Sequence, residues 1–462
     1  MKNYILLSAF LLSTTTIFGQ QNQVESDSTK TQTLEEVLVQ SVRVKPNAPI
    51  AHSNLTKAQL QSRNLGQDLP ILLNYLPSVV TTSDAGAGIG YTGIRVRGVS
   101  PLSTNVTING IPFTDAESLG AFWVNMPDFT SSVESLQLQR GVGTSTNGSG
   151  AFGASVNILT DASSYIPTAE VSNSFGSYNT IKHSVKFSTG KINDVFELSG
   201  RLSTINSDGY VDRAFSDLKS YFLQGTYNNN GTLIKALVFG GHEKTYQSWE
   251  GLTKQQLEDD RRQNPYTYEN EIDNYKQDHY QLHWNQKLNQ NWSTNLGLNY
   301  TYGRGYYEQY REDDAVSTYG GIVEATGVDF YGTAVTDLIR RRWLDNDFYV
   351  INATANYKES DLNFIVGGSY SNYDGDHFGE VIWARQFASE TSIRDQYYFG
   401  NGKKTDFSAF AKATYTLNSK IDVYGDLQLR NVGYKTSGLT SDLENMRIDE
   451  SYSFFNPKVG VS

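Results

Sequence analysis

Two closely spaced histidines are the residues whose types and positions could most readily perform chemistry. His279 and His283 lie four positions apart, so on a strand they share one face with Gln281. Imidazole nitrogens bind metal ions and haem, which makes a metal or haem contact one interpretation. A pair of solvated polar side chains is the simpler interpretation, and we favour it.

Other motifs give little support to catalysis. No glycine-flanked serine follows a strand with a suitably placed acid and histidine. Zero cysteines exclude disulfides, thiolate metal sites and cysteine nucleophiles. The glycines of residues 148–150 resemble a phosphate loop but lack its lysine, and the acidic runs 258–260 and 312–314 are typical of solvated loops. We predict that the protein is not an enzyme and has no cofactor and no resident metal.

Composition indicates a protein built mainly from β-strands. Aromatic residues make up 13% of the 462 residues, and 40 glycines accompany only 10 prolines. The net charge of -11 would repel a phosphate backbone, so nucleic acid is excluded as a partner. No run of eighteen apolar residues is present to form a membrane-spanning helix.

The N-terminal region has the pattern of an exported protein. A charged start followed by an apolar run predicts a signal peptide over residues 1–20, and the polar residues 21–33 predict a flexible linker. The alternating segment 34–44 could add itself as a strand to the sheet of another protein. An ordinary first strand of the next domain fits this segment equally well.

The stretch 133–160 organises the next part of the chain, because two alternating strands flank a glycine- and serine-rich turn there. Before it, residues 54–76 predict two short helices with Asn54 as a cap. Residues 94–98 predict a strand with two arginines on one face, and residues 113–123 predict a loop with exposed aromatic side chains. We therefore expect a small α+β domain over residues 45–162.

Residues 163–462 have a different pattern, in which roughly 12 alternating segments are joined by connections that are short and long in turn. One apolar and one polar face suit the strands of an antiparallel transmembrane β-barrel, whose short turns lie at one end and long loops at the other. Four long polar stretches are the expected outer loops: 206–217, 244–278, 303–346 and 373–405.

Four motifs in order resemble one family. LEEVLV at 34–39, IRVRG at 94–98, TINGIPF at 107–113 and the stretch 133–158 resemble the plug domain of TonB-dependent outer-membrane receptors. This resemblance implies a plug inside the lumen of a large barrel in the outer membrane of a Gram-negative cell, surrounded by outer-membrane lipid. It also implies that a TonB-type periplasmic energy transducer binds a TonB box formed by Leu34, Glu35, Glu36, Val37, Leu38 and Val39.

The resemblance also implies specific contacts inside the barrel. Arg95, Arg97 and Arg140 match positions at which plug arginines face acidic residues of the wall. Gln137 stands where many members have a glutamate, which weakens the expectation of that particular salt bridge. Topology places the candidate ligand contacts at the outer apex of the plug: Ser83, Asp84, Tyr91, Phe113, Asp115, Phe122 and Trp123.

The expected function is active import of a scarce small molecule, with a ferric siderophore or other iron complex as the leading candidate. Import of cobalamin or another organic nutrient is the alternative cargo. A surface adhesin or phage-binding barrel is the alternative class of protein.

Size predicts that more barrel follows. At ~4.8 Å between strands and a tilt of ~40°, twelve strands make a barrel about 24 Å across, whereas a domain of about 120 residues is some 35 Å across. Plugged barrels have about 22 strands. We therefore expect this chain to be the N-terminal part of a 22-strand barrel.

Overall fold

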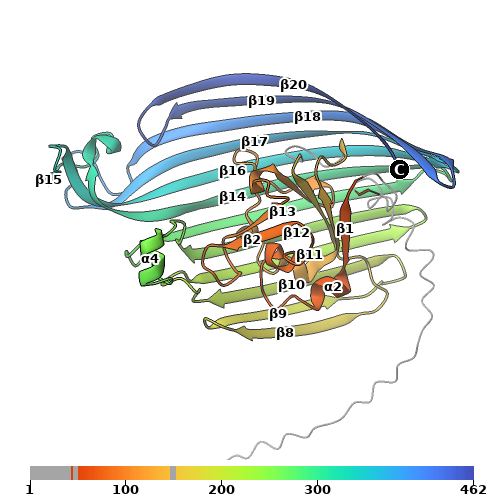
Figure 1. Ribbon diagram of the computed structural model, residues 1–462, viewed down its shortest axis with the longest axis horizontal. Coiled ribbons are helices and arrows are strands. Elements are labelled where there is room, and N and C mark those ends of the chain that lie inside the picture. The colour runs from red at the N-terminus through yellow and green to blue at the C-terminus, as the bar shows by residue number, and fades with distance from the viewer. Residues whose placement is uncertain (1–42, 45–49, 146–151) are drawn as a thin grey trace, which may run out of the picture.

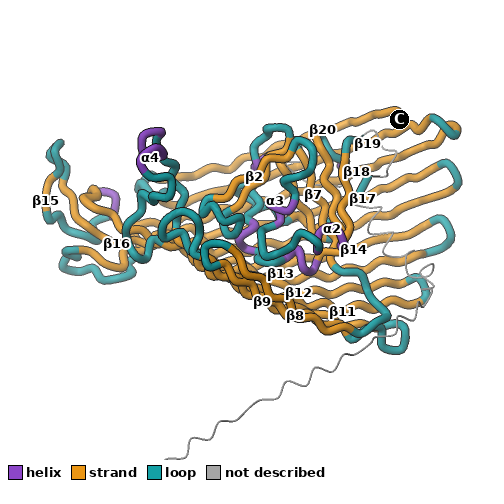
Figure 2. Tube along the Cα trace, turned by 60° about the horizontal axis from the view of Figure 1, so that its bottom comes forward, coloured by secondary structure: helices purple, strands orange, loops and turns teal. Residues whose placement is uncertain are grey.

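The computed structural model describes residues 43–44, 50–145 and 152–462. The predicted signal peptide, the linker and residues 34–39 lie outside the described residues. A small N-terminal domain lies against one face of a large curved sheet (Figures 1 and 2). This arrangement agrees with the plug inside a barrel that the family resemblance implied.

The N-terminal domain contains a five-stranded sheet in the order β1-β6-β7-β4-β5, in which only β4 and β7 are parallel. A separate hairpin joins β2 to β3. The strands are β1 (His52–Thr56), β2 (Val79–Ser83), β3 (Thr92–Val96), β4 (Thr104–Ile108), β5 (Ile111–Pro112), β6 (Val133–Arg140) and β7 (Ala154–Thr160). The helices are α2 (Lys57–Gln61), α3 (Leu69–Leu72), η1 (Pro101–Ser103), η2 (Trp123–Asn125) and η3 (Phe129–Ser132).

The two short helices agree with the prediction, but their cap does not. Thr56, rather than Asn54, is the N-cap of α2, and it forms a capping box with Gln59. Asn54 lies in β1, directly opposite Gln137 of β6. The strand thus continues two residues beyond the predicted cap, because pairing with β6 satisfies the backbone of Asn54.

A row of polar residues crosses the sheet of the N-terminal domain. Asn54, Gln137, Asn157 and Thr107 stand directly opposite one another on β1, β6, β7 and β4. Side-chain hydrogen bonds join Gln137 Nε2 to Asn54 Oδ1 at 2.8 Å and Thr107 Oγ1 to Asn157 Oδ1 at 2.8 Å. The sheet therefore has one strongly polar face, opposite the face that forms the apolar core.

The large sheet confirms the expected antiparallel architecture. Twelve strands follow one another from β8 to β20, and the short β15 pairs with β16 beside this path. Their bounds are β8 (Thr168–Gly176), β9 (Thr180–Ser188), β10 (Phe196–Ser207), β11 (Ser216–Asn229), β12 (Thr232–Tyr246), β13 (Ile272–Lys287), β14 (Trp292–Ala315), β15 (Gly327–Val328), β16 (Ala334–Glu359), β17 (Leu362–Ala384), β18 (Gln396–Asn418), β19 (Ile421–Leu439) and β20 (Asn445–Val461).

Two of the four stretches predicted as long loops, 303–346 and 373–405, consist largely of strand. β14 continues to Ala315, β17 continues to Ala384, and β18 begins at Gln396. Beyond the expected lipid band neither face of a strand contacts lipid, so the alternating pattern fades although the backbone remains paired. The short helix α4 (Lys254–Asp259) lies between β12 and β13, on the left side of Figure 1, and η5 (Val316–Tyr319) lies between β14 and β15.

The outward face of the large sheet is apolar and aromatic. Tyr280, Leu282 and Trp284 are exposed there, and the rings of Tyr280, Tyr300 and Tyr349 stack across three strands at 5.8 and 4.9 Å. Such a band of aromatic rings is typical of the membrane interface of a barrel. No helix among the described residues is both long enough and apolar enough to span a bilayer.

Candidate functional site

A cavity of about 680 Å³ lies between the tip of the N-terminal domain and the inner face of the large sheet. It lies toward the end of the strands that bears the long connections. Ten of the 27 residues that line it are aromatic, and its volume falls in the range of sites for small organic ligands. The aromatic lining residues are Tyr91, Phe113, Phe122, Tyr275, Tyr306, Tyr307, Trp343, Tyr373, Tyr398 and Tyr434.

Charged groups are placed around these rings. The hydroxyl of Tyr91 donates to Asp273 and, at 3.5 Å, to Glu243 Oε1. Arg342 lines the same cavity and donates to the hydroxyls of Tyr307 and Tyr397. Aromatic faces with convergent charged groups can stack on a planar ligand and orient it.

Four of the seven predicted ligand contacts line this cavity, namely Tyr91, Phe113, Asp115 and Phe122. Ser83 and Asp84 do not, because Ser83 ends β2 and Asp84 begins the turn of the β2–β3 hairpin. There the Ser83 hydroxyl accepts the N–H of Gly88 at 2.9 Å.

The prediction that the ring of Trp123 is exposed is wrong. Its side chain is only 4% exposed and lies in the core of the N-terminal domain, 6.1 Å from the ring of Phe113. Phe122, the preceding residue, is 40% exposed and lines the cavity. The 3₁₀ turn that begins at Trp123 sends the two adjacent rings in opposite directions.

Sequence reasoning missed Glu117, which connects the loop 115–120 to strands β17 and β19 of the large sheet. His377 Nε2 lies 2.7 Å from Glu117 Oε2, and the hydroxyls of Tyr373 and Tyr434 donate at 3.0 and 3.1 Å. Lys404 donates to the neighbouring carbonyl of Ala116 at 2.5 Å. Burial raises the pKa of Glu117, but the hydrogen bonds outweigh it, so the net pKa is lowered.

Buried ion pairs join the other side of the N-terminal domain to the sheet. Asp128 Oδ1 lies 2.5 Å from Lys182 Nζ, and Asp128 Oδ2 lies 3.1 Å from Arg201 Nη1. Asp161 similarly pairs with Lys186 at 2.5 Å. Burial raises the pKa of Asp128, but Arg201 and Lys182 outweigh it and hold the pKa at about 2. The acids therefore belong to the N-terminal domain and the bases to the wall, the reverse of the predicted arrangement.

The three predicted arginines do not make the contacts expected of them. Arg140 Nε donates to the carbonyl of Pro77 at 3.1 Å and its Nη2 donates to Ser53 Oγ at 3.0 Å, both within the N-terminal domain. Arg95 and Arg97 are exposed, and within the described residues neither forms an ion pair with the wall. Arg140 therefore links β6 to β1 and to the loop that precedes β2.

The two histidines are buried rather than solvated. The ring of His279 stacks on Phe239 at 4.7 Å and lies 5.7 Å from Phe113, while His283 is fully buried. No group of three or more potential metal ligands is found in the described part of the chain. These histidines fill the interface below the cavity.

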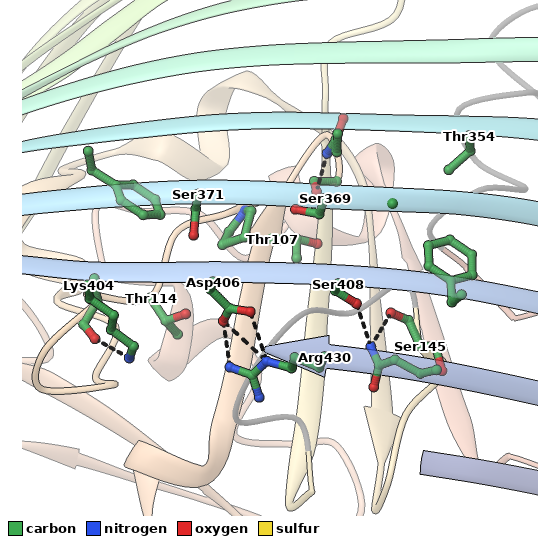
Figure 3. A pocket seen from close by; sticks show the side chains of 18 of the residues that line it. Thr107, Thr114, Ser145, Thr354, Ser369, Ser371, Lys404, Asp406, Ser408 and Arg430 are labelled. Atoms are coloured by element: carbon green, nitrogen blue, oxygen red, sulfur yellow. Dashed lines mark hydrogen bonds and ion pairs between the residues drawn. The ribbon is translucent and has the colours of Figure 1, made fainter. Parts of the chain in front are cut away.

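A narrow polar crevice of about 90 Å³ separates the N-terminal domain from strands β16 to β19 (Figure 3). Asp406 and Arg430 form a bidentate pair on its wall, with the shortest contact at 2.5 Å. Small polar side chains form much of the remaining surface, including Ser369, Ser371 and Ser408. Asp115 lines both this crevice and the outer cavity, so the two spaces adjoin.

Comparison with known proteins identifies the N-terminal domain. Residues 45–155 match the family model described as the TonB-dependent Receptor Plug Domain. This domain is a TonB-dependent receptor plug. It lies against the inner face of the large antiparallel sheet, and this arrangement fits an outer-membrane β-barrel protein.

Individual relatives agree with this assignment. A probable TonB-dependent siderophore receptor, PirA of Acinetobacter baumannii, is 25% identical over 224 residues, which are 46% of this chain and 28% of PirA. The ferric-catecholate import receptor Fiu of E. coli K12 superposes with a TM-score of 0.67 at 12% identity, covering 90% of this chain and 63% of Fiu. The siderophore receptor PiuA of Acinetobacter baumannii gives 0.64 at 14% identity, covering 90% and 62%. The chain thus spans less than two thirds of these relatives.

Proposed function

We propose that this protein imports a ferric siderophore or another iron complex across the outer membrane. The observation that carries the proposal is the aromatic cavity of about 680 Å³, formed jointly by the plug tip and the barrel wall. Rings on both sides can stack on a planar metal complex, and Arg342 offers a cation to its acidic groups. PirA, Fiu and PiuA are named as siderophore or ferric-catecholate receptors, which supports this class of cargo.

The energy is proposed to come from a TonB-type transducer that binds residues 34–39 as an added strand. Residues 43 and 44, which follow this segment closely, lie on the plug. A signal peptide over residues 1–20 would direct the protein out of the cytoplasm.

The test is uptake of labelled ferric siderophores and of cobalamin by cells that produce the full-length protein, with and without residues 34–39. Uptake of one iron complex that is lost on deletion, while surface binding persists, is the expected result. Uptake of cobalamin alone would show that cobalamin, and not an iron complex, is the transported molecule. Surface binding that is unaffected by the deletion, with no uptake of any compound, would favour an adhesin.

A further inference from the structure

The plug is attached very differently to the two sectors of wall that the structure describes. Toward β9–β12 it makes buried ion pairs and aromatic contacts, whereas toward β16–β19 it faces the polar crevice. We infer that the crevice is a hydrated passage for a hydrophilic solute, and that it widens while the plug stays attached to β9–β12. This inference rests on the proposed import function.

The contacts with β9–β12 resist separation. The side chain of Asp128 is fully buried between Lys182 and Arg201, so parting them would leave three buried charges unpaired. Phe129 of the plug lies 5.3 Å from Phe239 and 6.3 Å from Phe222 of the wall, and parting these rings would expose apolar surface. Separating the plug from β9–β12 therefore costs free energy both in unpaired charges and in exposed apolar surface.

The plug also approaches β12 very closely. A Cβ atom added to Gly241 would lie 2.3 Å from the carbonyl oxygen of Asn125, so only glycine allows the backbone of η2 to come this near. Ser220 of β11 donates to the carbonyl of Pro127 at 2.7 Å. Little space remains for water or solute between η2 and β12, although a polar pocket of about 160 Å³ lies farther along the wall beside Lys182 and Lys186.

The crevice has the opposite character. Among the described residues, the buried atoms Asn352 Oδ1 and Thr354 Oγ1 on its wall have no hydrogen-bond partner. Buried polar atoms without protein partners are normally satisfied by ordered water, and a space of about 90 Å³ holds several molecules. When this space widens, hydrogen bonds between the polar wall and ordered water are replaced by hydrogen bonds to further water molecules of similar strength, so the free-energy cost of widening is small.

The crevice is closed at both ends by polar contacts. At the outer end, Glu117 bonds to His377, and Lys404 bonds to the carbonyl of Ala116. At the inner end, the hydroxyl of Ser145 donates to Asp426 Oδ1 at 2.5 Å. Because Asp115 borders the outer cavity as well, a ligand bound there lies next to the outer closure.

Hydration is tested first, in the purified full-length receptor. Residues 1–462 contain no cysteine, so Ser408→Cys in the crevice and Ser220→Cys on the opposite sector each add one thiol to this part of the receptor, and the unsubstituted receptor gives the background labelling. The two serines are similarly buried, at 9% and 8% exposure. A small sulfonated methanethiosulfonate reagent should label position 408 at least tenfold faster than position 220. Equal rates, or faster labelling at position 220, would overturn the inference.

Widening is tested with two disulfide locks whose side chains touch across the opposite interfaces. Ser145→Cys with Asp426→Cys ties the plug to the crevice wall, and Thr160→Cys with Gln224→Cys ties it to β11, where the native oxygens are 3.1 Å apart. Disulfide formation is confirmed by mass spectrometry. Oxidation of the first lock should abolish uptake and leave ligand binding intact, with recovery on reduction, whereas oxidation of the second should permit uptake.

Blockage by the second lock, or uptake through the first, would overturn the inference. A parent receptor that takes up no cargo would instead contradict the proposed function, and the labelling comparison would still decide whether the crevice is hydrated.

Discussion

Lys182 Nζ lies 2.5 Å from Asp128 Oδ1, and both side chains are almost completely buried between plug and barrel. Arg201 completes the group from the neighbouring strand β10. Because these contacts join residues of the plug to residues of the wall, they fix the position of the plug in the barrel rather than the fold of either part.

Asp128→Asn should loosen the plug by about 3–5 kcal/mol, because it leaves Lys182 and Arg201 buried without a counter-charge. The measurement is the rate at which a protease cleaves the plug under native conditions. Asp217→Asn is the control, since its pair with Lys219 is exposed and is worth at most about 1 kcal/mol. Equal effects of the two substitutions would contradict this account.

Acid should loosen the same contact. The pKa of Asp128 is held at about 2 in the folded protein, below the value of about 3.9 for an unfolded aspartate. A lowered pKa contributes stability that is complete above pH 4 and is lost as the pH falls toward 2, amounting to about 2 kcal/mol. Unfolding measured in detergent between pH 5 and pH 2 should show this loss in the parent protein and a smaller one in Asp128→Asn.

Adjacent aromatic residues should respond in opposite ways. Phe122→Ala removes a ring from the cavity and should weaken binding of the transported iron complex about 5- to 10-fold, with stability almost unchanged. Trp123→Ala removes a buried ring and should destabilise the plug by about 3–5 kcal/mol. Ligand titration and plug proteolysis distinguish the two. Weaker binding by a stable Trp123→Ala would contradict the assignment.

A pair of glycines on neighbouring strands tests how closely plug and wall approach. Gly241→Ala places a methyl group 2.3 Å from the carbonyl of Asn125 and should displace the plug, whereas Gly225→Ala meets nothing within 4 Å. Proteolysis of the plug should accelerate at least tenfold in the first variant and stay unchanged in the second. Unchanged proteolysis of Gly241→Ala would contradict the predicted contact.

Gln137 should hold the segment that precedes the plug. Its Oε1 accepts the N–H of Val44 at 3.0 Å and its Nε2 donates to the carbonyl of Val44 at 3.2 Å, which a glutamate could not do. In a Val44→Cys protein, adding Gln137→Met should increase the rate of thiol labelling about tenfold.

The control places the thiol at Val156→Cys in place of Val44→Cys, again with and without Gln137→Met, because Val156 is buried inside β7. Its labelling should not change. Equal acceleration at both positions would show that Gln137 supports the whole plug and not this segment in particular.

The sequence predicted the elements that depend on local patterns. Alternation and the glycine-rich turn of residues 133–160 predicted β6 and β7, and the count of roughly 12 barrel strands agrees with the large sheet. Glu117 could not be found in this way, because its partners Tyr373 and Tyr434 lie 256 and 317 residues away. The reversed sign of the ion pairs was equally inaccessible, since periodicity does not tell which charge faces which.

The polar row formed by Asn54, Gln137, Asn157 and Thr107 bears on how the work of separating these strands depends on temperature. Separating strands over an apolar face raises the heat capacity and makes the work of opening depend on temperature. Amide and hydroxyl groups that become hydrated have the opposite, smaller effect on heat capacity. On this face, the force that parts the strands should therefore vary little between a cold and a warm environment.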